Sequence, residues 1–434
     1  MKKVQSSNIF IYAELIFLIL LGISKILRLD YLTILFLILI LIFPFLLKKK
    51  SHIIYLFILL PFFNILNLEF GSTSLFYLCI VLYFLRIFLN NDFKIEKKKV
   101  LIFVLLFIIR LTCGDLELVI KWILSFGLLL ILYDEDDINN NWDSIIKYMS
   151  LSHIIASVIG FIMLENGMSI YINGIVYSSL YGRSIRFAGL IGDPVFYSQF
   201  TSLLIACLFT LCFNKKHKYV YYILIIILFA FSTLTYAKTG LIIDFLLLIM
   251  YLFLLIKRNS KSRKTFFKNV VILVICVITL ILSVHYIKNN SNDALISNYF
   301  IRFSAEDLMT GRGEVSRHYI DKLISSWRTP FIAMKQSTYY EFYVTSKGQM
   351  VNRAHNIYIE TVCAYGLLAS ICMFAWLVKV IFITVFKEKK VINLFPIIVL
   401  ILSGITLHGH FEWIYYYMLL IAICFLQKLH FEEE

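Results

Sequence analysis

The residues best suited to chemistry in this chain stand together, directly before one apolar run. Arg353, His355 and Asn356 precede a stretch that is apolar enough for a membrane helix. Glu360 follows Asn356 by one helical turn, on the same face. Imidazole can take a proton near neutral pH, whereas arginine binds phosphate oxygens. A helix cap formed by Asn356 or His355 is the alternative interpretation. An ionisable Glu360 favours a site, because such groups in apolar runs face a wet cavity or a partner.

Two other segments combine basic residues with glycine. In GRSIRFAGLIGDP, Arg183 and Arg186 precede Gly189 and Gly192. Glycine lets the backbone approach a ligand closely, and arginine matches phosphate geometry, but a plain glycine-rich turn gives the same pattern. In LTYAKTGL, Lys238 stands in a tight turn between two apolar runs. It either extends to the lipid headgroups or binds an anionic one.

A third basic segment, Thr310–Trp327, has the pattern of an amphipathic helix. Its apolar residues recur every four positions, at Val315, Tyr319, Leu323 and Trp327. Arg312 stands at its start and Arg317 on another face. Such a helix either lies on the outer leaflet of a membrane or packs on the outer ends of other helices.

The elements that must position these residues are membrane helices. Of the 434 residues, 60% are hydrophobic, and they occur in long blocks separated by short charged stretches. Because about 20 apolar residues cross roughly 30 Å of hydrocarbon, this pattern predicts an all-α polytopic integral membrane protein. The net charge of +14 lies largely in short loops and reflects the positive-inside bias rather than nucleic-acid binding.

Lysine clusters predict the topology. Each consecutive pair of clusters brackets an even number of apolar runs, so all clusters and both termini are expected in the cytoplasm. The clusters are Lys2–Lys3, Lys48–Lys50, Lys94–Lys99, Asn214–Lys218, Lys257–Lys264 and Lys387–Lys390. The predicted helices are 9–26, 31–47, 52–68, 74–90, 100–113, 118–133, 146–164, 196–213, 219–237, 240–256, 269–287, 356–378, 391–407 and 413–427. The total is about 12–14, because 100–113 and 118–133 could instead form a re-entrant hairpin.

Four regions follow from this topology. Amino-terminal helices occupy 1–164; helices with a first outer loop (165–195) occupy 165–287; a large extracytoplasmic loop with the amphipathic helix occupies 288–355; carboxy-terminal helices occupy 356–434. Glu14, Arg110 and Asp244 stand within apolar runs, where we expect them to pair across helices or line a cavity. His408 and His410 are two residues apart, which does not align them on one helix face, so no metal site and no cofactor are predicted.

The order of these segments resembles the bacterial O-antigen polymerase and O-antigen ligase superfamily. RFAGLIGDPVFYSQF is similar to the family's Arg-x-x-Gly-x-x-x-(Asn/Asp)-Pro segment, and LTYAKTGL to its Ser-Arg-(Thr/Ser)-Gly turn. TGR followed by Trp327 resembles the Gly-Arg…Trp helix of the large loop, and AHNIYIETVCAYGL the His-Asn-x-(Tyr/Phe)-(Leu/Ile) helix start. Two departures stand out: Ala237-Lys238 replaces Ser-Arg, and the Gly-x-Gly that often follows the loop proline is missing after Pro330. The likeness covers residues 186 to about 370.

The resemblance implies a metal-independent glycosyltransferase of the bacterial cytoplasmic (inner) membrane. Its donor would be an undecaprenyl-diphosphate-linked oligosaccharide, and its other partners membrane lipid and a chain-length regulator. His355 would act as base, with Asn356 and Glu360 orienting it. Arg186, Lys238 and Arg312 would bind the diphosphate, and the remaining candidate substrate-binding residues are Arg183, Arg317 and Arg353.

A repeat-unit polymerase for O-antigen, capsule or exopolysaccharide is the predicted activity. The alternatives are an O-antigen ligase, which transfers glycan to a lipid core, and a lipid-linked oligosaccharide flippase. The transporter interpretation gives no reason for a large outer loop, and the chain shows no repeated halves.

Overall fold

The computed structural model describes most of the chain. The described residues are 2–47, 49–66, 74–89, 97–113, 119–120, 123–124, 127–128, 142–166, 186–214, 219–290, 312–325, 331, 334, 341–345, 350–351, 353–387 and 391–406. Helices account for nearly all of them, as predicted for an all-α protein, and a short antiparallel strand pair joins them.

The helical elements follow one another along the chain with short connections. They are α1 (Lys2–Ile26), α2 (Asp30–Leu46), α3 (Lys49–Leu59), η1 (Leu60–Ile65), α4 (Leu75–Leu89), α5 (Lys97–Cys113), α8 (Trp142–Glu165), α9 (Pro194–Asn214), α10 (Tyr219–Thr233), α11 (Lys238–Asn259), α12 (Arg263–Asn290), α14 (Arg312–Ile324), α16 (Ile357–Phe382), η2 (Ile383–Lys387), η3 (Val391–Leu394) and α17 (Phe395–Gly404). The strands are β1 (Tyr343–Val344) and β2 (Met350–Val351), with Tyr343 opposite Val351.

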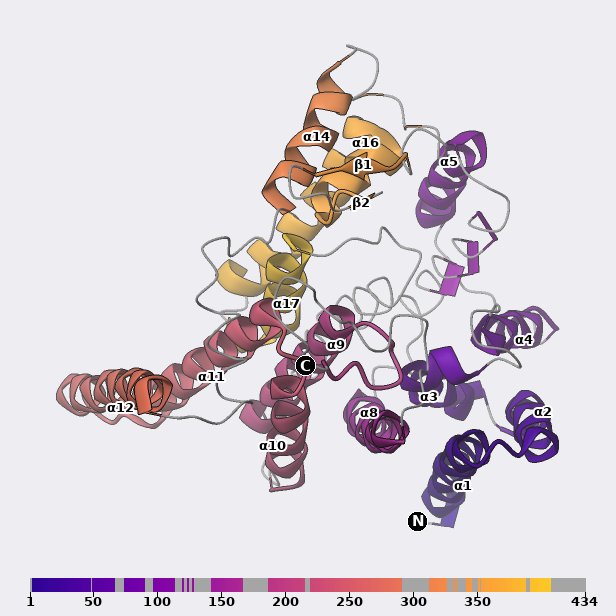
Figure 1. Ribbon diagram of the computed structural model, residues 1–434, viewed down its shortest axis with the longest axis horizontal. Helices are drawn as coiled ribbons and strands as arrows, with labels where there is room; N and C mark the ends of the chain where they lie inside the picture. Colours follow the sequence, from indigo (N-terminus) through magenta and orange to yellow (C-terminus); the bar gives the residue numbers. More distant parts are fainter. Residues whose placement is uncertain are drawn as a thin grey trace.

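Helix α9 is the centre of the bundle. It contacts α8, α10, α11 and α17, and nearly all of its residues are buried (Figure 1). The amino-terminal helices α1 to α4 pack against one another and join the rest of the bundle through α8. A helix enclosed on all sides by apolar neighbours can carry small polar side chains only if these are hydrogen-bonded within the protein. Thr201, Ser202 and Thr210 of α9 meet this requirement by bonding to the carbonyl groups of the preceding turn.

Several helices have the length and composition of membrane spans. Within the described residues, α8, α9 and α11 are long and apolar enough to cross a membrane, and α16 with η2 would add a fourth span if its bent halves are counted together. The outward faces carry apolar side chains, among them Phe88 (72% exposed) and Phe267 (71% exposed), which suit a lipid environment. The total of about 12–14 spans stays a prediction, since 413–427 lies outside the described residues and 118–133 lies largely outside them.

Helix boundaries differ from the predicted ones by a few residues, mostly outward. α8 begins at Trp142 rather than 146, and α12 extends over Arg263–Asn290 rather than 269–287. Hydropathy detects only the apolar part of a helix, and polar turns can continue it beyond the hydrocarbon. α10, in contrast, ends at Thr233 rather than 237, because residues 234–237 form the turn to α11.

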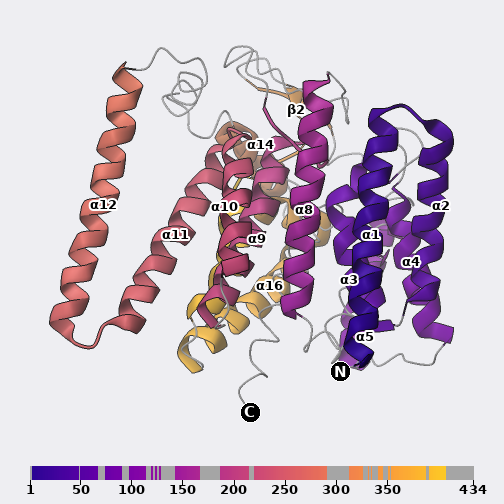
Figure 2. The same cartoon turned by 90° about the horizontal axis from the view of Figure 1, so that it is seen from below.

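The two ends of the bundle differ in what they carry. Figure 2 shows α14 and β2 at one end, and the lysine-containing connection between α11 and α12 at the other, where α1 also begins. The start of α11 therefore lies at the same end as α14. This end contains the segments singled out by the sequence.

Candidate functional site

The segment before α9 forms a tight, glycine-dependent turn. Asp193 Oδ1 accepts hydrogen bonds from the N–H groups of Val195 (2.7 Å) and Phe196 (3.1 Å), so Asp193 caps a helix whose first residue is Pro194. Gly189 has a φ of 53°, and a Cβ there would lie 2.4 Å from the Tyr197 ring. The glycine and the Asp-Pro pair therefore have structural functions that need no ligand.

Arg186 connects this segment to the α10–α11 turn. Its Nε donates to the carbonyl oxygen of Thr235 (3.0 Å), and the next residue, Phe187, donates its N–H to Leu234 O (3.1 Å). Arg186 is only 7% exposed. The side chain predicted to bind diphosphate is thus also part of the framework that holds the turn.

Lys238 is the first residue of α11. The turn before it is stabilised by Thr235, whose Oγ1 donates to Ser232 O (2.7 Å) and accepts the N–H of Ala237 (3.1 Å). Two residues after Lys238, Gly240 lies so close to Ser198 of α9 that an added Cβ would be 1.6 Å from Ser198 Oγ. The glycine of the LTYAKTGL segment therefore allows α9 and α11 to meet directly beside Lys238.

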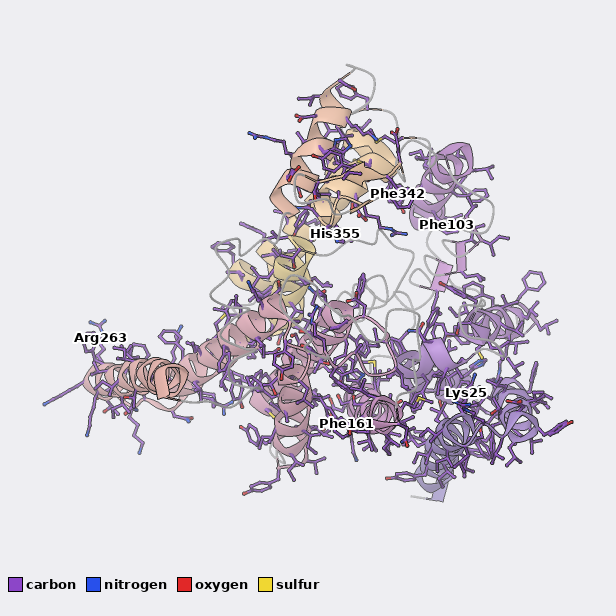
Figure 3. The ribbon with its side chains drawn as sticks, in the orientation of Figure 1. Lys25, Phe103, Phe161, Arg263, Phe342 and His355 are labelled. Carbon is purple, nitrogen blue, oxygen red and sulfur yellow. The ribbon has the colours of Figure 1, made fainter. Side chains whose placement is uncertain are left out.

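His355 and Asn356 form the entry to α16. Asn356 Oδ1 accepts hydrogen bonds from the N–H groups of Tyr358 (3.0 Å) and Ile359 (3.2 Å), which makes Asn356 the helix cap. His355, labelled in Figure 3, is half-buried and has a φ of 49°. A left-handed conformation costs a residue with a Cβ roughly 1–2 kcal/mol, so the surrounding contacts hold His355 in a defined orientation.

Helix α14 packs on the first turns of α16. Val315, Tyr319 and Leu323 are buried together with Ala354 and Cys363. Ser316 Oγ donates to Ala354 O (3.3 Å), directly before His355. Of the two interpretations of the amphipathic pattern, packing on other helices is the one observed.

The opposite side of α14 faces outward. Ile320 (44%) and Ile324 (68%) are exposed, and Arg317 is exposed as well. Arg317 is therefore not brought to His355. Trp327 lies outside the described residues.

Tyr319 is the residue of this region that sequence reasoning missed as chemistry. Its pKa is raised by burial and by the nearby Glu360 carboxyl, whereas Arg353 acts in the opposite direction. Tyr319, Glu360 and Arg353 are therefore electrostatic neighbours, although they come from different segments. Glu360 itself is fully buried. The four-residue apolar repeat disguised Tyr319 as a core residue; the hydroxyl at its tip was the only signal that could have revealed it.

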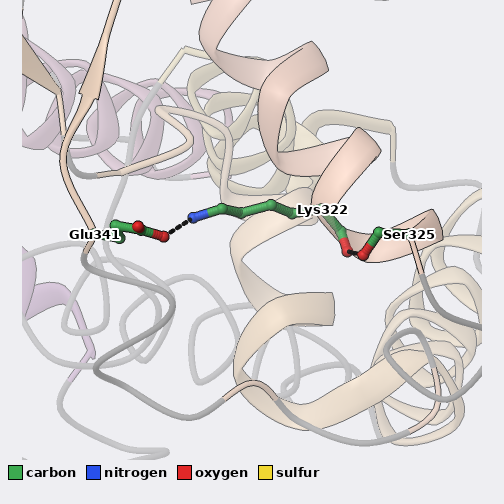
Figure 4. Close-up of polar contacts among 3 residues, drawn as sticks. All are labelled: Lys322, Ser325 and Glu341. Atoms are coloured by element: carbon green, nitrogen blue, oxygen red, sulfur yellow. Dashed lines mark hydrogen bonds and ion pairs between the residues drawn. The ribbon is translucent and has the colours of Figure 1, made fainter.

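The start of β1 is held on α14 by polar and aromatic contacts. Lys322 Nζ lies 2.8 Å from Glu341 Oε2 (Figure 4), and Tyr343 OH donates to Glu314 Oε1 (2.8 Å). The Tyr343 ring stacks on His318, with centroids 4.0 Å apart and planes 18° apart. Lys322 lowers the pKa of Glu341, and burial together with Lys322 lowers the pKa of His318.

Helix α17 links the starts of α16 and α11. Tyr358 OH donates to Ile401 O (2.7 Å), and Thr406, just beyond α17, donates through Oγ1 to Thr239 Oγ1 (3.2 Å). The two groups of candidate residues, around Arg186 and Lys238 and around His355 and Glu360, are therefore joined by a continuous set of contacts at one end of the bundle.

No family model, curated protein or solved structure matches this chain. The placement of its residues is therefore the evidence on which a function can be argued.

Some predicted residues cannot be placed. Arg183, His408 and His410 lie outside the described residues. Arg312 begins α14, but its side chain lies outside what the structure describes, as does that of Arg110. In the described part of the chain, no three His, Cys, Asp or Glu side chains are grouped as metal ligands.

Proposed function

We propose that this chain is a polysaccharide repeat-unit polymerase of the bacterial cytoplasmic membrane. It would transfer glycan from undecaprenyl diphosphate to the sugar of a second lipid-linked repeat unit. The observation that carries the proposal is the meeting of four distant segments at one end of the bundle. Each of them contains a residue suited to binding a diphosphate or moving a proton.

The contacts between these segments are specific. The bonds of Arg186 and Phe187 to residues 234–235 join the first segment to the second. The packing of α14 on α16 and the Ser316–Ala354 bond join the third to the fourth. Helix α17 bridges the second and the fourth. Such a gathering favours a shared site over four unrelated turns.

This end of the bundle would face outward. The positive-inside rule assigns the lysine-rich connections, including the one between α11 and α12, to the cytoplasm. The end with α14 is then extracytoplasmic, which is where a polyprenyl diphosphate presents its headgroup after its tail has entered the lipid. With about 12–14 spans, both termini would be cytoplasmic.

The chemistry would be a single displacement at the anomeric carbon. The acceptor hydroxyl oxygen forms the new bond to that carbon while the bond to the diphosphate oxygen breaks, and His355 takes the hydroxyl proton. Lys238, Arg186 and Arg312 would stabilise the negative charge on the departing undecaprenyl diphosphate. Asn356 and Glu360 would hold the start of α16, and with it His355, in place.

The test begins with a strain that lacks this gene, from which surface glycan and lipid-linked intermediates are extracted. We expect single repeat units displayed on their final carrier. Full-length chains accumulating on undecaprenyl diphosphate would show a ligase instead. Single units facing the cytoplasm would show a flippase, and the roles of His355 and the basic residues would be refuted.

The base is tested by variants that respect the left-handed backbone at position 355. His355→Ala would mix the loss of the base with backbone strain, whereas His355→Asn and His355→Gly both tolerate a positive φ. We expect both variants to insert normally and to make no polymer. Normal chain length in either variant would remove His355 from the mechanism.

A further inference from the structure

A chain of hydrogen bonds runs from the candidate diphosphate site to an acidic residue inside the bundle. Arg186 Nε donates to Thr235 O (3.0 Å), and Thr235 Oγ1 donates to Ser232 O (2.7 Å). Ser232 Oγ in turn donates to Asp244 Oδ2 (2.6 Å). The four residues come from three elements: the segment before α9, the α10 end and turn, and α11.

Asp244 is placed where three helices meet. It is fully buried. Ser202 of α9 provides a second hydroxyl at its carboxyl group, in addition to Ser232 of α10. One turn earlier on the same pair of helices, Gly240 and Ser198 make the close contact between α11 and α9. The carboxyl group therefore joins α9, α10 and α11 directly below the turn that ends at Lys238.

An acidic residue at such a position requires a compensating function, because ionisable groups inside a membrane helix are costly. Helix packing by itself would be served by an apolar side chain of the same size. What an apolar side chain cannot do is accept the Ser232 hydroxyl and so fix the α10 end, whose carbonyl holds Thr235. Tyr236, in the middle of this turn, has a φ of 51°, so the turn is strained and needs such support.

We propose that Asp244 is a positioning residue for the donor diphosphate site. Through Ser232 and Thr235 it holds the 234–238 turn in the one conformation that places Lys238 and Arg186 together. This inference rests on the proposed function, since it assumes that the two basic residues bind the diphosphate of the lipid-linked donor.

The experiment uses the full-length protein in lipid nanodiscs and undecaprenyl diphosphate as the probe. Equilibrium binding of the probe is measured together with hydrogen exchange of the amides in 234–238. We expect Asp244→Leu to bind about fivefold more weakly, the effect of one lost hydrogen bond in a site, and to exchange faster in the turn. Asp244→Asn, which keeps an oxygen for Ser232, should bind within about twofold of the wild type.

Thr235→Val is the second variant, because it keeps the side-chain volume and serves if Asp244→Leu fails to fold. It should weaken binding and accelerate exchange in the same way. Its matched control is Thr210→Val, which removes a buried hydroxyl bonded to Ile392 O (3.2 Å) at the other end of α9. This control should bind the probe as the wild type does.

The outcomes separate the two proposals. If the wild type does not bind undecaprenyl diphosphate, the proposed donor is wrong and the inference falls with it. If the wild type binds but Asp244→Leu and Thr235→Val bind equally well, Asp244 does not position the site, and the proposed function stands. A loss of binding in Asp244→Asn equal to that in Asp244→Leu would also refute the inference, because it would assign the effect to charge rather than to the hydrogen-bonded chain.

Discussion

Gly240 offers the sharpest test of the packing that places Lys238. A Cβ at this position would lie 1.6 Å from Ser198 Oγ and 2.9 Å from Ser198 Cβ. Both distances are shorter than real Cβ contacts, so Gly240→Ala must rotate the serine and also separate α9 from α11. The perturbation is one methyl group placed between the helices that carry Lys238 and Asp193.

The magnitude follows from two opposing effects. Overpacking of this kind costs roughly 1–3 kcal/mol. Replacing glycine by alanine in a helix returns up to about 1 kcal/mol of helix propensity. We therefore expect Gly240→Ala to lower the free energy of unfolding by about 1–2 kcal/mol.

A second substitution identifies the cause. Ser198→Gly alone should cost about 0.5–1 kcal/mol as a glycine in a helix. In the double variant the serine atoms that the new methyl would strike are gone, so we expect a favourable coupling of about 1–2 kcal/mol between the two substitutions.

The assay is unfolding of the purified protein in mixed detergent micelles, followed by tryptophan fluorescence. The control is Gly313→Ala in α14, where an added Cβ would meet nothing within 4 Å. It should leave stability unchanged or slightly higher. Strictly additive effects of Gly240→Ala and Ser198→Gly, or a Gly240→Ala variant as stable as the wild type, would refute the reasoning.

Two further predictions concern the outer end of the bundle. Because burial and Lys322 lower the pKa of His318 below its ordinary value of 6.5, its contribution to stability is present above that value and is lost as pH falls through the lowered pKa. Amide exchange across β1 should therefore accelerate between about pH 7.5 and pH 5.5 in the wild type but not in His318→Phe, which can stack on Tyr343 without titrating; equal acceleration in both would contradict this. Asn356→Ala should destabilise α16 by about 1 kcal/mol, whereas Asn356→Asp keeps the cap. If Asn356→Asp retains stability but loses polymerisation, the amide also orients His355; if it retains both, Asn356 acts only as a cap.

Local signals in the sequence were sufficient for the helices and for their ends. Long apolar runs have few alternatives to helix, because in lipid every backbone amide must be satisfied within its own segment. The Asp193-Pro194 pair and Asn356 begin helices through bonds that span three residues or fewer, so their types alone announce the start of α9 and α16. The repeat of Val315, Tyr319 and Leu323 likewise required a buried face.

What covers that face could be decided only by the tertiary structure. The pairing of Arg186 with Thr235, the nearness of Tyr319 to Glu360, and the contact of Gly240 with Ser198 join residues more than 40 positions apart, or on different helices. No local pattern encodes such distances. The left-handed backbone of His355 also depends on its surroundings, since histidine in isolation does not prefer it. The sequence by itself determined which segments form helices and which residues could act; their meeting at one end of the bundle depended on how those helices pack.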